Sequence, residues 1–278
     1  NASNGSKFII RNGQFKNVGG WRGLFMAAGA SIEITDGNFE SDQRIFGMSD
    51  SDGKVFTVDI LGGTYKSTGS ALFFMSYAGP KVKISGGTFE STGSSIAEFS
   101  NASYGGTFEI VSGVFNYNPT KAWDGNNVRG VFSGSGATIV IDTAAGKEAP
   151  VFNTNACIFR LMDNDVLSPL VIKSGVFNAT GNGRIFLINA NTIKYTTVNG
   201  ELVRSNVEDD GAKKGRVNIY DGTFSSEFGA AIEYTTVYEL AQVNVLGGDF
   251  TACRIPLKMC TDSQLTGIER LTAGCIAT

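Results

Sequence analysis

The stretch Val82-Lys83-Ile84-Ser85-Gly86-Gly87-Thr88-Phe89 carries the pattern that predicts the fold of this chain. Val82 and Ile84 alternate with polar residues, which is typical of a strand with one buried face. The Gly-Gly-Thr-Phe segment follows at once, and glycine supplies a special backbone turn that other residues adopt poorly. The stretch therefore predicts a short strand, a tight turn and an aromatic ring that packs into the core beneath the turn.

The same pattern recurs along the chain. The turn aromatics are Phe15, Phe39, Tyr65, Phe89, Phe115, Phe152, Phe177, Phe224 and Phe250, and the first five are 24 or 26 residues apart. An alternating apolar pair precedes most turns, and a second apolar cluster such as Leu72-Phe73 follows the aromatic by about ten residues. Only the copy at Ala149-Pro150-Val151-Phe152 lacks the glycine. Each repeat thus supplies two or three short strands.

Such a repeat cannot bury its own inner face and must stack on its neighbours, which produces a solenoid. The composition agrees, because 36 Gly, 20 Phe and only 5 Pro in 278 residues favour short strands and tight turns. Leucine-rich repeats need a Leu and Asn spacing that is absent, and nonapeptide and hexapeptide solenoids have much shorter periods. We expect one all-β domain over residues 1–278, a wide parallel β-helix of about nine coils of 24 to 26 residues.

The repeats resemble the pectin-lyase-like parallel β-helix superfamily, and most closely the Gly-Gly-Thr-Phe-repeat β-helices of large microbial surface proteins. This resemblance implies a right-handed helix and an extracellular or cell-surface location. It is specific for architecture, because the same superfamily contains lyases, hydrolases, phage tailspikes and non-catalytic adhesins.

Two coils are longer than the rest, with aromatic spacings of 37 and 47 residues. We expect loop insertions near 117–129 and 193–214, since insertions in solenoids emerge as loops and often carry function. The second insertion contains Asn199-Gly200, which favours a hairpin. The first offers a candidate glycan-binding platform, unless its tryptophan folds back over the core; its residues are Lys121, Trp123, Asp124 and Asn126.

The four cysteines match no zinc-binding spacing, and the chain has no His. Cys157 lies three coils before Cys253, about 14 Å along the axis, which is too far for a disulfide. We expect Cys157 to be a small buried thiol. A disulfide is expected among Cys253, Cys260 and Cys275, within a C-terminal cap over residues 251–278 that protects the open end of the solenoid.

Two Asp-rich turns offer hard oxygen ligands suited to Ca²⁺: Asp50 and Asp52 in one, Asp163 and Asp165 in the other. The alternative is that these are ordinary solvated turn residues. No other cofactor is expected. The positions after the turn aromatics predict a ladder of opposite charges followed by asparagines down the stack: Lys16, Glu40, Lys66, Glu90, Asn116, Asn153 and Asn178.

No complete catalytic motif is present. Without His there is no Ser-His-Asp machinery, and the Gly-His-Gly element of polygalacturonases is missing. A lyase of this superfamily needs carboxylates beside a basic residue, and no carboxylate cluster accompanies the recurring arginines on matching coils: Arg22, Arg44, Arg129, Arg184 and Arg254.

The net charge of −3 excludes nucleic acid as an expected partner, and no apolar run is long enough to insert into a membrane. We expect a non-catalytic extracellular β-helix module for cell-surface adhesion or glycan binding, with glycans or host or cell-surface molecules as partners. The alternative is a carbohydrate-active enzyme, a polysaccharide lyase or hydrolase with a divergent active site. A carboxylate cluster with an adjacent Arg or Lys in a groove along the helix separates the two.

Overall fold

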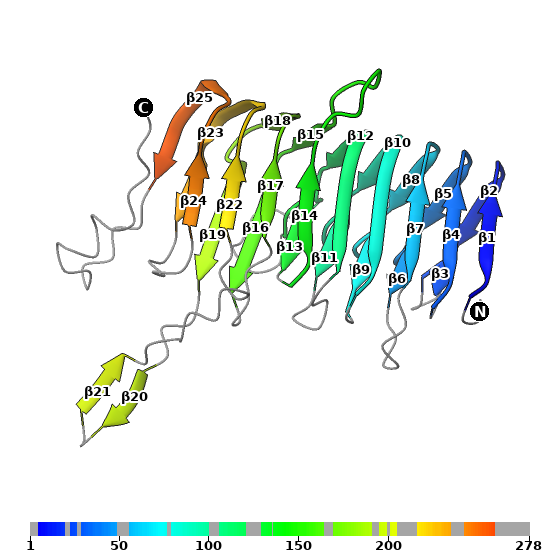
Figure 1. Cartoon of the computed structure of the whole chain (residues 1–278), viewed down its shortest axis with the longest axis horizontal. Helices are drawn as coiled ribbons and strands as arrows, with labels where there is room; N and C mark the ends of the chain where they lie inside the picture. Colours follow the sequence, from blue (N-terminus) through cyan, green and yellow to red (C-terminus); the bar gives the residue numbers. More distant parts are fainter. Residues whose placement is uncertain are drawn as a thin grey trace.

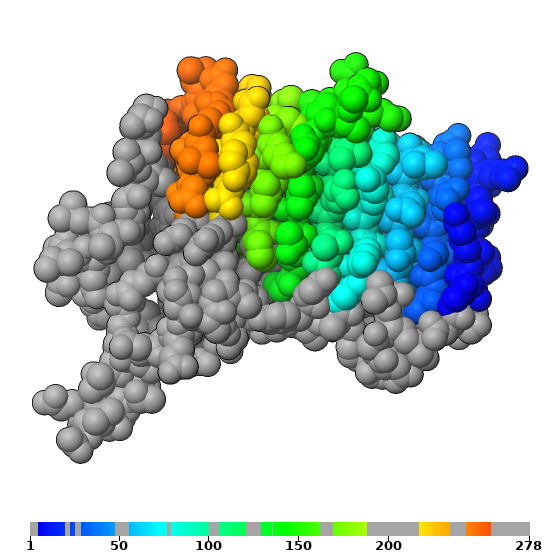
Figure 2. Space-filling model, viewed as in Figure 1, coloured from blue at the N-terminus to red at the C-terminus, as the bar shows by residue number. Residues whose placement is uncertain are grey.

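The computed structural model describes residues 5–19, 23–26, 29–48, 56–76, 79–99, 106–120, 129–134, 136–163, 169–190, 195–198, 201–204, 216–234 and 242–258. Within these residues the protein is all-β and contains no helix. Parallel strands stack into a solenoid, and successive coils follow one another along its long axis (Figures 1 and 2). The predicted all-β parallel β-solenoid is confirmed.

The coils build three parallel faces. The first face holds the strands that precede the turns: β1 (Lys7–Ile10), β4 (Ser31–Ile34), β7 (Thr57–Ile60), the first parts of β10 (Lys81–Ser91) and β12 (Thr107–Tyr117), β14 (Thr138–Ile141), β17 (Leu170–Ile172), β22 (Arg216–Ile219) and β24 (Gln242–Val245). Their pairing keeps the predicted apolar pairs in register, for example Ile32 with Val58 and Ile34 with Ile60. These apolar residues point inward and are buried along most of the stack.

The second face follows the turns. It contains β2 (Gln14–Asn17), β5 (Asn38–Ser41), β8 (Thr64–Ser67), the last parts of β10 and β12, β15 (Val151–Thr154), β18 (Val176–Ala179), and the first parts of β23 (Thr223–Tyr234) and β25 (Asp249–Lys258). The third face contains β3 (Phe25–Met26), β6 (Phe46–Met48), β9 (Phe73–Met75), β11 (Ala97–Phe99), β13 (Phe132–Gly134), β16 (Cys157–Asp163), β19 (Arg184–Ala190), and the last parts of β23 and β25.

The turn glycines form a column between the first two faces. Gly37, Gly63 and Gly87 all have positive φ, at 139°, 97° and 105°. A Cβ on Gly63 would lie 2.9 Å from the carbonyl oxygen of Gly37, one coil earlier. That oxygen accepts a hydrogen bond from the Thr64 amide at 2.8 Å. Glycine is therefore required both for its backbone conformation and for the close approach of the coils.

The turn aromatics form a continuous stack through the core. Neighbouring rings, from Phe15 to Phe250, have centroids 4.3 to 5.0 Å apart, and their planes are within 16° of parallel. The degenerate copy at Phe152 keeps its place in this stack although its turn lacks glycine. The separation matches the spacing of adjacent strands, about 4.8 Å, so each coil contributes one layer of aromatic core.

The two long intervals between turn aromatics, of 37 and 47 residues, do not change the register of the second face. Phe115 pairs directly with Phe152, and Phe177 pairs directly with Phe224. Tyr117, at the predicted start of the first insertion, is still the last residue of β12. In the second interval β20 (Tyr195–Val198) and β21 (Glu201–Arg204) pair antiparallel on either side of residues 199–200, which confirms the predicted hairpin. The predicted cap over residues 251–278 begins inside a strand, since residues 251–258 belong to β25. Residues 259–278 lie outside the described residues.

Candidate functional site

Most of the predicted site residues lie outside the described residues. This applies to the platform of Lys121, Trp123, Asp124 and Asn126 and to Asp50, Asp52 and Asp165. Asp163 is the last residue of β16, in register with Ala190, and its side chain is outside the description. Among the side chains that are described, no three His, Cys, Asp or Glu residues are grouped so that they could hold a metal ion. The glycan platform and the calcium turns stay predictions.

Two cysteines are described, and both are free, buried thiols. Cys157 is fully buried in β16, as predicted, and burial raises the pKa of its thiol to about 12. Cys253 lies in β25, and its thiol donates a hydrogen bond to the Phe224 carbonyl oxygen at 3.2 Å. Because Cys253 is free, the expected C-terminal disulfide remains a prediction only for Cys260 and Cys275, which lie outside the described residues.

The outer row of the second face forms the predicted ladder. Lys16 pairs with Glu40 at 3.1 Å, and Lys66 pairs with Glu90 at 3.9 Å. Further along, the Asn153 amide donates to the Asn116 side-chain oxygen at 2.9 Å. The Asn178 side-chain amide in turn donates to the Asn153 side-chain oxygen, also at 2.9 Å. The exposed faces are thus stabilised from coil to coil, each exposed ion pair contributing about 0.2–1 kcal/mol.

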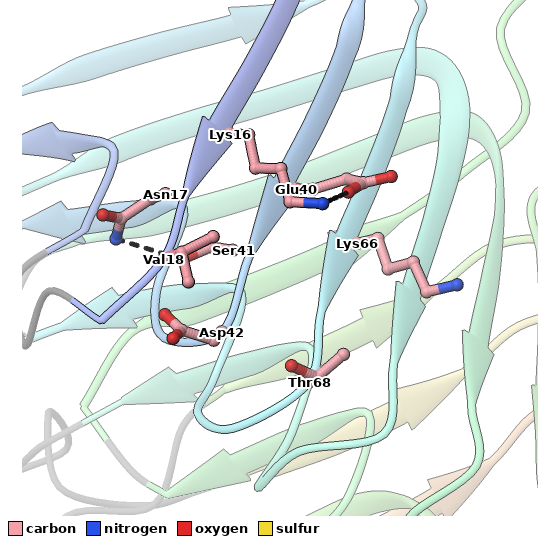
Figure 3. Close-up of a pocket in the computed structure, with 8 residues that line it drawn as sticks. All are labelled: Lys16, Asn17, Val18, Glu40, Ser41, Asp42, Lys66 and Thr68. Carbon is pink, nitrogen blue, oxygen red and sulfur yellow. Dashed lines mark hydrogen bonds and ion pairs between the residues drawn. The ribbon is translucent and has the colours of Figure 1, made fainter.

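A groove opens where the second face ends, at the corner that follows β2, β5 and β8. It has a volume of about 200 Å³ and is lined by Lys16, Asn17, Val18, Glu40, Ser41, Asp42, Lys66 and Thr68 (Figure 3). The lysines and Glu40 come from the outer row, whereas Val18, Asp42 and Thr68 come from the corner. Three successive coils therefore contribute equivalent positions to one continuous surface.

The groove combines both signs of charge with an apolar side chain. Glu40 lies between Lys16 and Lys66 in the register of the face. One Asp42 oxygen accepts a hydrogen bond from the Gly19 amide at 2.6 Å, and the other is buried without a hydrogen-bond partner. Val18 is 72% exposed. The arrangement offers donors, acceptors and a small apolar contact along the solenoid axis.

Sequence reasoning identified the charged row but not this groove. Lys16, Glu40 and Lys66 were interpreted only as ladder partners, which they are. No motif in the sequence marks Asp42 as a site residue, because it stands one position after the last residue of β5. A comparison of the positions just after each second-face strand, such as Val18, Asp42 and Thr68, would have found the corner.

The outer row of the third face is charged and largely covered. It runs in register through Phe74, Glu98, Ser133, Arg160, Leu187 and Glu233. Arg160 is 4% exposed and Glu233 is 7% exposed. The Arg44 guanidinium lies 3.7 Å from the centroid of the Phe74 ring. Burial lowers the pKa of Arg44. Charged groups this deeply buried need partners.

Two arginines of the recurring set supply such partners. Arg129 forms an ion pair with Glu98, and Arg184 forms one with Glu233, so each of these two arginines has a single carboxylate partner rather than a carboxylate cluster. In both pairs the carboxylate comes from a neighbouring coil, 31 and 49 residues away, and the long intervals hid this register. Both carboxylates are held by a guanidinium and mostly covered, so each pair compensates a charge that would be costly to bury alone.

Comparison with known proteins identifies no relative: no family model, no curated protein and no solved structure matches the chain. The architecture therefore rests on the repeat and its strand register. In the part of the chain that the structure describes, no helix is long and apolar enough to cross a membrane.

Proposed function

We propose that this chain is a non-catalytic, extracellular or cell-surface β-helix module that binds a glycan in the groove along β2, β5 and β8. The observation that supports it is the groove itself, with Lys16, Glu40 and Lys66 along one side and Asp42 at the corner. The proposal includes the finer architecture: a right-handed helix of about nine coils, two loop insertions and a C-terminal cap. It also retains the Trp123 loop as a second candidate glycan contact.

The chemistry of the groove suits a sugar chain. Hydroxyl groups of a glycan can donate to Glu40 and Asp42 and accept from Lys16 and Lys66. Val18 supplies an exposed apolar side chain for the C–H face of a sugar ring. Equivalent groups recur at the strand spacing of about 4.8 Å, so a polymer of repeating units can meet them in succession.

A binding role fits better than catalysis, because each carboxylate of the groove is held by one partner and keeps only its remaining acceptor capacity for a ligand. Glu40 is 3.1 Å from the Lys16 ammonium group, and Asp42 accepts the Gly19 amide. A general acid or base needs a carboxyl that is free to exchange a proton with the substrate. Glu98 and Glu233 on the third face are paired with arginines and largely covered.

One observation favours the alternative, a polysaccharide lyase or hydrolase with a divergent site. Glu40 and Asp42 lie in a groove together with Lys16 and Lys66, which is the combination of carboxylates and bases that such an enzyme needs. The two functions make different predictions for turnover. Incubation with uronate polymers would raise the absorbance near 235 nm only for a lyase, and new reducing ends would appear only for an enzyme that cleaves the chain.

A glycan array tests the binding proposal. We expect the wild type to retain one related set of glycans and Asp42→Asn to lose at least tenfold in affinity for it, because the substitution removes the charged acceptor and keeps the shape. Glu109→Gln is the control for loss of a carboxylate outside the groove, since Glu109 pairs with Lys83 at 3.1 Å on the first face. Trp123→Ala reports on the loop.

Equal loss in Asp42→Asn and Glu109→Gln, or no retained glycan at all, would contradict the proposal. Loss in Trp123→Ala alone would move the binding site from the groove to the loop. Turnover of any retained glycan would favour the enzyme.

A further inference from the structure

The outer surface of the second face changes character partway along the solenoid. Up to β10 its outer row is charged, and it ends with Lys66 and Glu90, 3.9 Å apart. In β12, β15 and β18 the outward positions of this face are valines and asparagines, and all six are partly exposed. The strand register aligns them in two rows: Val114, Val151 and Val176 in one, and Asn116, Asn153 and Asn178 in the other. We call these six uncharged side chains the Val/Asn floor.

The asparagines of the floor retain hydrogen-bonding capacity. Asn153 donates to the Asn116 side-chain oxygen and accepts from the Asn178 amide, both at 2.9 Å. A side-chain amide has two N–H donors and an oxygen with two lone pairs. Asn153 therefore keeps one donor and one acceptor for a ligand, while the ladder holds its amide in place. Equivalent amides recur at the strand spacing of about 4.8 Å.

An anchored loop borders the floor on the side of the first face. The turn between β7 and β8 has three residues, whereas residues 142–150 separate β14 from β15 and protrude from the solenoid (Figure 1). Both neighbouring coils hold this loop. The Ser112 hydroxyl donates to the Glu148 carbonyl oxygen at 2.9 Å, and Asp142 pairs with Lys173 at 3.3 Å. Insertions in solenoids often carry function, and this one directly precedes the strand at the centre of the floor.

The floor continues the row of side chains that lines the groove. Four successive pairings lead from Lys66 in the groove through Glu90, Asn116 and Asn153 to Asn178. At about 4.8 Å per pairing, the far end of the floor is about 19 Å beyond Lys66. A ligand that lies in the groove along the solenoid axis therefore reaches the floor if it is long enough.

From these observations we infer that the ligand of the groove is a linear polysaccharide whose further units are neutral and lie on the Val/Asn floor. This inference rests on the proposed glycan binding and specifies the class of glycan. Sugar hydroxyl groups can donate to and accept from Asn153, and the C–H face of a sugar ring can pack on the valines. A carboxylate or sulfate would lose hydration there and meet no cation among the six side chains of the floor.

A length series of immobilised oligosaccharides tests the inference. The array carries glucans, mannans, xylans and N-acetylglucosamine oligomers from disaccharide to octasaccharide, beside oligouronates of the same lengths. We expect one neutral series in which the affinity of the wild type rises at least tenfold from the shortest to the longest oligomer, because only long oligomers reach the floor. Asn153→Leu should reduce the affinity for the longest oligomer to that for the shortest, and leave the affinity for the shortest unchanged.

The first face provides a matched control for this variant. Asn218 accepts a hydrogen bond from the Asn244 side-chain amide at 2.8 Å, so Asn218→Leu removes the same kind of amide pair away from the floor. It should bind every oligomer as the wild type does. Val151→Lys places a charge on the floor and leaves the amide ladder intact, so it should weaken only the longer oligomers. Thermal unfolding of each variant shows whether the folded chain was tested, and Val151→Lys decides if Asn153→Leu does not fold.

Several outcomes would overturn the inference and leave binding in the groove standing. These are affinity that does not depend on length, stronger retention of oligouronates than of neutral oligomers of the same length, and equal losses in Asn153→Leu and Asn218→Leu. Retention of no glycan at all would contradict the proposed function as well as the inference.

Discussion

The glycine of each turn is held by the coil before it as much as by its own backbone. Gly37 has φ of 139°, and a Cβ there would lie 2.9 Å from the Phe39 ring and 3.1 Å from the Gly13 carbonyl oxygen. Gly146 also has positive φ, at 73°, but a Cβ there would meet nothing within 4 Å. Gly37 therefore combines a backbone conformation open mainly to glycine with close contacts, whereas Gly146 has a left-handed conformation without contacts.

Replacing these glycines by alanine should therefore give different results. We expect Gly146→Ala to lower the free energy of unfolding by about 1 kcal/mol, from backbone strain alone. Gly37→Ala should cost about 3 kcal/mol, because overpacking against the ring and the carbonyl adds to the strain. Urea unfolding of the two variants measures the difference, and equal losses would show that contact with the neighbouring coil does not matter.

Buried ionisable side chains predict a loss of stability at alkaline pH. Burial raises the pKa of Cys157 from 9.0 to about 12, and it also raises the pKa values of Tyr65 and Tyr117. Below pH 9 the thiol is protonated in both folded and unfolded chains, so its ionisation does not make the stability depend on pH. Between pH 9 and 12 only the unfolded chain loses its proton. The free energy of unfolding then falls by up to about 1.4 kcal/mol per pH unit for this group.

Urea unfolding at pH 8, 9, 10 and 11 tests this linkage. Cys157→Ala should be less stable than the wild type at pH 8, because it leaves a small cavity. It should then lose less stability than the wild type between pH 9 and 11, so that the two curves converge. Curves that stay parallel would show that the Cys157 thiol does not contribute to the alkaline loss.

At the scale of the elements, a small residue in the core row of the third face is compensated by a large residue from the first face. Its inward row contains Phe46, Phe73, Phe132, Phe159 and Phe186, but Ala97 takes the position between Phe73 and Phe132. Phe108, whose neighbours Val82 and Ile139 in the first-face row are smaller, fills the space that Ala97 leaves. Its ring meets those of Phe73 and Phe132 edge-on, at 5.2 and 5.8 Å.

Ala97 and Phe108 should therefore tolerate a change in side-chain size only when both are changed together. Phe108→Val leaves a cavity and should cost about 3 kcal/mol. Ala97→Phe overpacks the same space and should cost about 2 kcal/mol. In the double variant Ala97→Phe/Phe108→Val the new ring occupies the vacated volume, so we expect a loss well below the sum of the single losses. Chemical denaturation of all four proteins completes the cycle, and additive losses would rule out the compensation.

The elements also show what the sequence could predict. The first two faces were predictable because Val82, Ile84 and Phe89 stand at fixed offsets from a glycine in nearly every repeat. The ion pairs of the third face were not, because Glu233 reaches Arg184 across an interval of 49 residues whose length hides the register. The groove was missed because Asp42 lies in a corner, where hydrogen bonding and burial follow from the stacking of coils rather than from a local motif.

At the scale of the whole molecule, the central feature is one uninterrupted ladder. Seven successive pairings join Lys16 to Ser225 through Glu40, Lys66, Glu90, Asn116, Asn153 and Asn178. Both long intervals fall within the last three of these pairings. The intervals thus extend the chain without lengthening the solenoid, and the register that builds the groove continues past them.

Spin-label distances measured by pulsed electron resonance test this claim most directly, in a background where the four native cysteines are replaced. One protein carries Lys16→Cys and Asn116→Cys, four pairings apart, and the other carries Lys16→Cys and Ser225→Cys, seven pairings apart. At about 4.8 Å per pairing we expect mean distances of about 19 and 34 Å. Their difference of about 14 Å does not depend on the label linker. A difference near 19 Å or more would mean that a long interval adds a coil, and a broad distribution for the second pair would mean that the ladder is broken; either result would contradict the account.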